Sequence, residues 1–308
     1  MTRVPVVFCF DDNLILPAGV CLHSLLSHAD PETFYDIFIL HGSDSNFPDS
    51  GFLERLHEQY DHFSLTYRNV GNSFSGAFEI RNITSVTYYR LLIPELIPEY
   101  DKVMYHDVDV IFRGDLRKIF EATELGSDYI AGVITPSYGD VEFTNYLTKL
   151  NLNVADYVMA GNMIMNIDLM RKQKATAVFR KMVGESTYKY QDMDILNIYC
   201  KGKIKRLPPA FCGTIEIFEF ASNAIQQSLY SAQELHDVLS EGIIHYNGAK
   251  PWNSWCPNLD IWWAYYRGSV FYDPKFYFDF FNHKLTEYDR LPLSKRIKIL
   301  FRYFKTRL

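Results

Sequence analysis

The chain of 308 residues lacks several features that would assign its class at once. No uncharged apolar run approaches the roughly 20 residues that an α-helix needs to span a bilayer, so the sequence predicts no membrane-spanning helix. The five cysteines are odd in number and show no CxxC spacing, which excludes a zinc ribbon and argues against a disulfide scaffold. The first apolar stretch runs directly into Asp11 and Asp12 without a small-residue cleavage site. We therefore expect no secretory signal and a cytoplasmic protein.

An excess of positive charge is also missing, since the net charge is −6. That balance excludes a general nucleic-acid binder, so we expect no nucleic-acid partner. Residues 293–308 differ, because they hold six basic residues and no acid, which leaves a net charge of −12 on the rest of the chain. The six are Lys295, Arg296, Lys298, Arg302, Lys305 and Arg307. An acidic body with a basic end indicates a separate partner for that end.

Strand-like and helix-like segments alternate through the first half of the chain. Strand-like patterns cover residues 4–10, 35–40, 63–70 and 102–105, and helix-like patterns cover 17–28, 52–60 and 87–96. This alternation predicts βαβ units around a mainly parallel sheet, which is an α/β fold. Because ligands of such sheets bind at the carboxyl ends of the strands, the polar turns after residues 10 and 105 are the places where a site is expected.

The second half is less regular. Its patterns predict a buried strand at 158–167, helices at 169–183 and 191–199, and a strand at 242–246. No internal repeat, low-complexity segment or Gly/Ser linker divides the chain. We therefore expect one catalytic domain over residues 1–255, followed by an aromatic and basic C-terminal region over residues 256–308.

Asp107 and Asp109 are the sharpest candidate pair. Carboxylates at positions i and i+2 of an extended backbone point to the same side, so these two could hold a divalent cation together. A solvated acidic loop explains the spacing equally well.

His245 and Lys250 form a second candidate group beside a glycine turn at Gly248. A lone histidine after an apolar strand is more often a packed or hydrogen-bonded residue than a metal ligand. Lys250 could contact a phosphate as a point charge, or could be an ordinary surface lysine.

Two further polar groups complete the set. Asp11 and Asn13 could bind a base and a ribose, or could cap the helix that follows them. Asp192 and its neighbours could carry chemistry, or could be the acidic first turn of a helix. Two carboxylates, an imidazole and a lysine together suit a metal-bound diphosphate, and mixed oxygen and nitrogen ligands favour Mn²⁺ over Mg²⁺.

Five segments carry a family resemblance and occur in the family's order within residues 4–252. They are VVFCFDDN, NITSVTYYRLLIPELI, YDKVMYHDVDVIF, YQDMDILN and HYNGAKPW. Together they resemble the retaining glycosyltransferases of family 8, above all the bacterial lipopolysaccharide galactosyl- and glucosyltransferases. The resemblance implies the GT-A fold, a Rossmann-like nucleotide-sugar-binding α/β domain.

The resemblance also implies roles for individual residues. It assigns the metal to Asp107, Asp109 and His245, and the donor nucleotide to Asp11, Asn13, Arg90, Val108, Gly248 and Lys250. It assigns the catalytic positions to Asp192, which would contact the donor sugar, and to Met193. The implied cofactor is Mn²⁺, less readily Mg²⁺, with UDP-glucose or UDP-galactose as the donor. Catalysis would neutralise the charge that grows on the leaving UDP while an acceptor hydroxyl attacks with retention.

Several residues depart from the family pattern. Met193 stands where the family has a polar residue such as Gln, Met159 where it has Asn, and Thr135 where it has Asp. Leu14 replaces a tyrosine that commonly stacks on the base. A thioether replaces an amide poorly as a hydrogen-bonding group, so we expect altered sugar or acceptor preference or weakened activity.

The basic end has apolar residues at helical spacing, among them Ile297, Leu300, Phe301 and Phe304. This pattern predicts an amphipathic helix that attaches to anionic lipid. A C-terminal helix packed on the body with a solvated basic face is the alternative.

The sequence therefore predicts a UDP-hexose-dependent retaining glycosyltransferase, peripheral on the inner face of the membrane, with a lipid-linked glycan such as a lipopolysaccharide core as acceptor. The alternatives are a protein- or self-glycosylating enzyme of the same fold, a catalytically impaired UDP-sugar-binding protein, and a metal-dependent phosphohydrolase that would release UMP.

Overall fold

The computed structural model describes residues 1–80, 84–137, 140–185, 187–222 and 230–305, with side chains up to residue 301. A seven-stranded sheet in the order β3-β2-β1-β4-β7-β6-β8 forms its centre. The strands are β1 (Thr2–Cys9), β2 (Thr33–His41), β3 (Phe63–Asn69), β4 (Lys102–His106), β6 (Ile130–Ile134), β7 (Val158–Asn166) and β8 (Ile204–Arg206). A second sheet pairs β5 (Val110–Ile111) with β9 (Ile244–His245).

Most pairings in the large sheet are parallel. Strands β3, β2, β1 and β4 run in one direction, and β6 is parallel to β8. Only β7, of the strands described, is antiparallel to both its neighbours, β4 and β6. The predicted α/β fold with a mainly parallel sheet is therefore confirmed.

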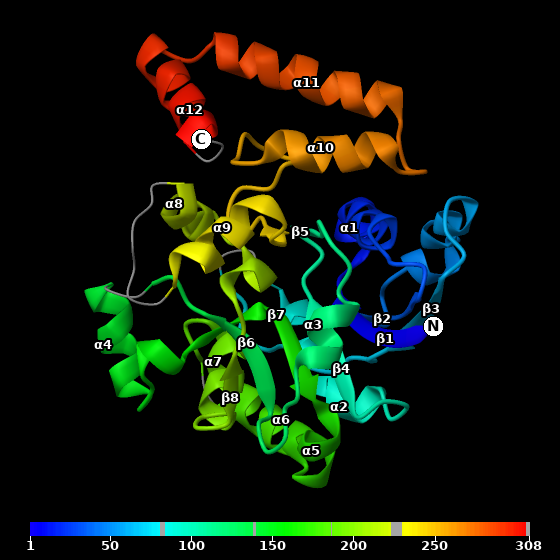
Figure 1. The fold of residues 1–308 in the computed structure, drawn as a ribbon, viewed down its shortest axis with the longest axis vertical. Helices are drawn as coiled ribbons and strands as arrows, with labels where there is room; N and C mark the ends of the chain where they lie inside the picture. The colour runs from blue at the N-terminus through cyan, green and yellow to red at the C-terminus, as the bar shows by residue number, and fades with distance from the viewer. Residues whose placement is uncertain (81–83, 138–139, 186, 223–229, 306–308) are drawn as a thin grey trace.

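Helices cover the sheet and extend beyond it (Figure 1). The α-helices are α1 (Ile15–Ser27), α2 (Ile93–Leu96), α3 (Arg117–Ala122), α4 (Val141–Lys149), α5 (Ile167–Lys172), α6 (Ala175–Glu185), α7 (Gln191–Tyr199), α8 (Ile215–Ser222), α9 (Ala232–Ser240), α10 (Leu259–Gly268), α11 (Pro274–Asp289) and α12 (Leu293–Lys305). The 3-10 helices are η1 (Asp12–Leu14), η2 (Phe47–Asp49), η3 (Leu53–Glu58), η4 (Ser85–Leu92), η5 (Val154–Asp156) and η6 (Pro209–Cys212).

Some elements differ from the sequence prediction. The single helix expected at 169–183 is wrong, because Lys174 has φ of 54° and separates α5 from α6. The helices expected at 52–60 and 87–96 consist largely of 3-10 turns. Strands β6 and β8 were not predicted; β8 has only three residues and no buried face, so it shows no period-two pattern.

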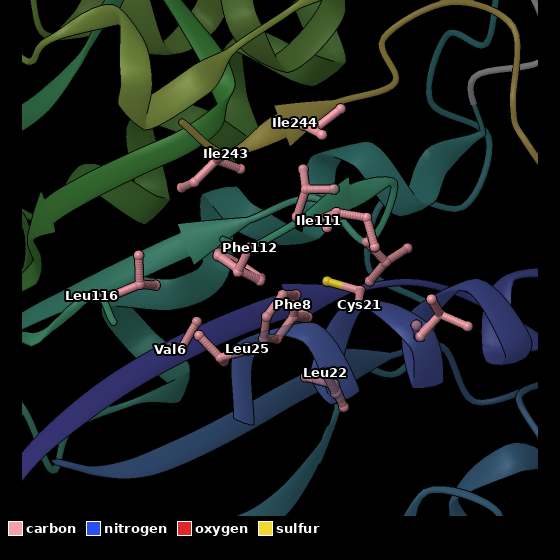
Figure 2. Packing of buried hydrophobic residues seen from close by; sticks show 14 of the residues in the cluster. Val6, Phe8, Cys21, Leu22, Leu25, Ile111, Phe112, Leu116, Ile243 and Ile244 are labelled. Atoms are coloured by element: carbon pink, nitrogen blue, oxygen red, sulfur yellow. The ribbon is translucent and has the colours of Figure 1, made fainter. Parts of the chain in front are cut away.

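The apolar face predicted for α1 packs as expected. Figure 2 shows Leu22 and Leu25 of α1 against Val6 and Phe8 of β1, with Ile111 of β5 beside them. All five side chains are at most 1% exposed, and full burial of such a side chain contributes roughly 1.5–3 kcal/mol. This packing fixes the carboxyl end of β1 and the short β5–β9 sheet relative to each other.

The last three helices lie together at one end of the molecule. Figure 1 shows α10, α11 and α12 beyond α1 and β5, on the side away from α5 and α6. Helix α10 contacts α1. Among the residues that the structure describes, no helix has the length and apolar character that crossing a bilayer requires.

Candidate active site

The carboxyl ends of two parallel strands place the first acidic residues of the candidate site. β1 and β4 are adjacent, with Val7 opposite Tyr105, and both strands end at the same edge of the sheet. Asp107 follows β4 directly, and its backbone N–H donates to the carbonyl of Gly161 at 2.8 Å. The chain then turns into β5. Asp107 is therefore held at the edge where ligands of parallel sheets bind.

The short second sheet brings His245 to the same place. Val110 of β5 pairs with His245 of β9, which lies far along the chain. The His245 Nε2 atom is 3.3 Å from an Asp109 carboxylate oxygen and 3.8 Å from one of Asp107. One donor atom from each of the three residues lies within 4.8 Å of the other two. Two carboxylates and one imidazole at this spacing form a donor set that suits a divalent transition metal.

Positive charge balances the two carboxylates. The Lys250 ammonium forms an ion pair with Asp109 and donates to the carbonyl of Tyr246 at 2.6 Å. Although burial disfavours its charge, His245 and Lys250 hold the pKa of Asp109 below its ordinary value. Burial likewise opposes charge on His245, but Asp109 raises the pKa of the imidazole well above 6.5. Two cationic groups therefore compensate the Asp109 carboxylate.

Gly161 of β7 leaves space beside this group. A Cβ atom at this position would lie 2.5 Å from His245 Cε1 and 2.7 Å from Asp107 Oδ2. Those distances are shorter than any real carbon contact, so a larger residue would displace both side chains. The donor set and the space kept free beside it together fit a bound cation.

We expect Gly161→Ala to weaken Mn²⁺ binding by about 100-fold, since displaced ligands lose the geometry that coordination needs. Calorimetric titration of Mn²⁺ measures the change. Gly184→Ala is the matched control, because a Cβ at that position in α6 meets no atom within 4 Å. Equal Mn²⁺ affinity in the two variants would contradict the assignment of this site.

The pKa of His245 predicts how metal binding depends on pH. The imidazole must lose its proton to ligate a metal. Because the folded, metal-free pKa is raised, the affinity for Mn²⁺ is expected to fall by up to about tenfold for each pH unit of acidification, with one proton released on binding. Titration in two buffers of different ionisation enthalpy counts that proton. His283→Gln, on exposed α11, should keep the same slope, and a pH-independent affinity would exclude His245 as a ligand.

Arg90 occupies the buried centre of a second group of charges. Its side chain is 8% exposed, and it donates to Asp107 at 2.9 Å and to the carbonyl of Ala160 at 2.7 Å. Its Nε atom lies 3.1 Å from Asp192. The guanidinium also lies over the ring of Tyr105, 4.4 Å from its centroid. Burial opposes the charge, but the two carboxylates raise the pKa of Arg90 above its ordinary value.

Arg90 thereby joins Asp192 to the β4 edge. Asp192 opens α7 and accepts a hydrogen bond from the Thr87 hydroxyl at 2.5 Å. Burial, partly offset by Arg90, raises the pKa of Asp192. Met193, the next residue, is only half-buried and packs against both neighbouring apolar clusters. It therefore presents a thioether beside Asp192.

The other predicted residues lie in turns around this centre. The Asp11 carboxylate caps η1 by accepting from the Asn13 backbone N–H at 3.0 Å, so the capping role weighed for it is present. Gly248 is exposed and Val108 is buried. Within the described part of the chain, the hydrogen bonds of Asp11 and Asn13 do not link them to Asp107, Asp109 or His245.

A buried polar chain behind His245 was missed from the sequence. Asn162 contacts the His245 Nδ1 atom at 3.3 Å and the Cys212 sulfur at 3.1 Å, and its oxygen lies 2.5 Å from His106 Nδ1. His106 and Asn162 are paired across β4 and β7. Polar residues inside two otherwise apolar strands were the available signal, since buried polar groups find partners. These hydrogen-bonded side chains fix the orientation of the His245 imidazole, as residues outside the ligand set do in metal sites.

Comparison of the sequence with known proteins identifies a family and several relatives. The profile described as Glycosyl transferase family 8 matches residues 5–256. The chain is 26% identical over 189 residues to the glycosyltransferase GlyB of Streptococcus pneumoniae, which covers 60% of this chain and 43% of GlyB. It is 26% identical over 178 residues to the lipopolysaccharide 1,2-glucosyltransferase of Escherichia coli, covering 55% of this chain and 49% of the relative. These matches span less than half the length of either relative.

A solved structure gives the same fold. The galactosyltransferase LgtC, determined with donor and acceptor sugar analogues, matches with a TM-score of 0.70 and 24% identity. The match covers 88% of this chain and 98% of LgtC. The GT-A architecture predicted from the sequence is therefore confirmed by structure as well as by strand order.

Proposed function

Because the chain belongs to glycosyltransferase family 8, we propose that it transfers glucose or galactose from a UDP-sugar to a hydroxyl of a lipid-linked glycan, with retention at the anomeric carbon. A lipopolysaccharide core is the acceptor we favour, since a relative is named a lipopolysaccharide glucosyltransferase. The observation that carries the proposal is the Asp107–Asp109–His245 group, with Lys250 beside it, at the ligand-binding edge of the sheet.

Asp107, Asp109 and His245 would hold Mn²⁺. The cation would act as a Lewis acid that offsets the negative charge growing on the leaving diphosphate. Lys250 is anchored to the Tyr246 carbonyl, so its ammonium offers fixed positive charge for the same diphosphate.

On the other side of the site, Arg90 orients two acids at once. By pairing with both Asp107 and Asp192, it fixes Asp192 at the start of α7, where we propose that this acid contacts the donor sugar. The half-buried thioether of Met193 lies next in sequence and offers only a weak acceptor. We propose that this pair of residues sets the sugar preference, with Asp11 and Asn13 at the nucleotide.

We further propose that residues 1–255 form the catalytic domain and that residues 256–308 attach it to the cytoplasmic face of a membrane. Of the apolar residues predicted for the tail, Ile297, Leu300 and Phe301 are 42%, 47% and 72% exposed on α12. They are therefore partly open to solvent, and exposed Lys295 and Lys298 accompany them. The side chains of Arg302, Phe304, Lys305 and Arg307, which belong to the same prediction, lie outside the described residues.

Product analysis tests the proposed reaction. The protein is incubated with a panel of UDP-sugars, with and without Mn²⁺ and without acceptor, and nucleotide products are separated. Metal-dependent UDP release from one sugar supports the proposal and names the donor. Release of UMP would mean a phosphohydrolase, and UDP binding without release in the presence of glycolipid acceptors would mean an impaired binding protein. Intact-mass analysis detects self-glycosylation.

A further inference from the structure

A cavity lies outside the candidate active site. It is about 580 Å³ in volume and is enclosed by α10, α11, α12 and the segment before α10. Its walls are mainly apolar and include Trp255, Trp263, Phe281, Tyr288 and Ile299. The volume lies within the roughly 300–1,000 Å³ that small-molecule sites occupy.

Rigid aromatic packing on one side keeps the cavity from collapsing. Trp263 of α10 is fully buried and packs against Phe280 and Phe281 of α11, with ring centroids 4.5 Å and 5.2 Å away. Trp255 packs on Tyr288 at 6.4 Å. These rings have few rotatable bonds and hold each other in place. The space between them is therefore a property of the fold at this position.

Polar groups lie at both ends of the wall: Trp255 and Asp260 near the start of α10, and Arg267 near its end. The indole Nε1 atom of Trp255 is buried and has no hydrogen-bond partner among the described residues. A buried N–H without an acceptor costs about 1–3 kcal/mol, as an order of magnitude, unless a ligand supplies one. Arg267 also lines the cavity and donates to the Tyr277 hydroxyl at 2.8 Å. A ligand with an apolar chain and a carbonyl oxygen matches this combination.

The cavity opens onto the apolar outer face of α11 and α12. Leu285 and Leu300 line it and are nevertheless 53% and 47% exposed. Beside them, Phe278 and Phe301 are 59% and 72% exposed. Exposed lysines accompany these residues on α12, where the described side chains include no acid. An apolar face with basic residues is attracted to an anionic bilayer.

We propose that this cavity takes one acyl chain of an anionic phospholipid from the bilayer on which α11 and α12 rest. The chain would enter between Leu285 and Leu300, pack against Trp263, and offer its ester carbonyl to the Trp255 N–H. The inference rests on the membrane attachment proposed above for residues 256–308 and does not depend on the transfer reaction. Under this proposal α11 and α12 enclose part of a lipid molecule, whereas membrane attachment alone requires only that they lie on the bilayer surface.

Tryptophan quenching by brominated lipid tests the inference. The full chain is mixed with phosphatidylglycerol vesicles whose acyl chains are brominated near the middle or are unmodified, and bound protein is separated by sedimentation. We expect brominated vesicles to quench the tryptophan fluorescence strongly. Trp255→Phe should remove part of that quenching and leave the part that comes from Trp263, which also lines the cavity.

Ala264→Phe fills the cavity from an exposed position on α10, so it does not require repacking of the core. Each acyl-chain methylene that the phenylalanine excludes from the cavity lowers the occupancy of the cavity by lipid about fourfold. The variant should therefore sediment with vesicles as before but lose the quenching. Ala177→Phe, exposed on α6, should behave as the unsubstituted chain. Undiminished quenching in Ala264→Phe, or no vesicle binding by the unsubstituted chain, would overturn the inference. UDP release by the same preparations reports separately on the transfer reaction.

Discussion

Replacing Asp109 by asparagine is expected to lower metal-dependent sugar transfer by about a thousandfold, the size that loss of several kcal/mol of charge stabilisation implies. Asp109 lies 3.3 Å from His245 and pairs with Lys250, so it contacts both cationic groups of the site. The asparagine keeps the shape of the side chain but removes the charge that attracts the cation. The measured quantity is kcat/KM at saturating Mn²⁺.

Asp61→Asn is the matched control for this experiment, because the Asp61 side chain is fully exposed and pairs with the neighbouring His62. It should leave kcat/KM unchanged. Removing a carboxylate beside two cations also alters stability, so urea unfolding of each variant is needed to show that the protein is folded. Full activity of a folded Asp109→Asn protein would exclude the proposed metal site.

Replacing Arg90 by methionine is expected to destabilise the fold by about 3–5 kcal/mol, because it leaves buried carboxylates without a partner. Asp192 is 7% exposed at its side chain and depends on Arg90 and Thr87 for compensation. The free energy of urea unfolding at about pH 7 measures the effect. Arg180→Met is the control, since the Arg180–Glu95 pair is about half exposed at both side chains and contributes at most about 1 kcal/mol.

The pH dependence of this variant has a defined sign. The pKa of Asp192 is already raised by burial, and loss of Arg90 removes the charge that opposes the rise. A carboxyl whose folded pKa is raised favours the folded state in its protonated form. The deficit of Arg90→Met relative to the unsubstituted chain should therefore shrink as the pH falls through the folded pKa. A deficit that grows on acidification would mean that Asp192 is not the uncompensated group.

The site residues that could be predicted from the sequence are those that lie close together along the chain. Asp107 and Asp109 could be recognised as a pair, because their spacing and the strand before them are local. His245 joins them only through the β5–β9 pairing, which no local pattern encodes. The family resemblance supplied that connection. The Arg90–Asp192 ion pair could not be predicted from the sequence either, because the two residues come from separate elements, η4 and α7.

The secondary structure likewise divides into elements that local sequence patterns predict and elements that they do not. Strand-like patterns predicted β1, β2, β3, β4 and β7, while the short β8 gave no periodic signal. The positive φ of Lys174 breaks a helix whose side-chain pattern is continuous, so periodicity alone joined α5 to α6. The role of Gly161 becomes visible only in space, where a Cβ would meet His245.

The central claim is that Asp107, Asp109 and His245 hold a cation that binds the donor diphosphate. Calorimetric titration of UDP into the full chain, with Mn²⁺ or with a chelator, tests it most directly. The account predicts that UDP binds in the presence of Mn²⁺, and that chelator or His245→Ala lowers the affinity by at least about tenfold, as the loss of one metal-mediated charge contact implies. Equal UDP affinity with and without the metal would contradict it.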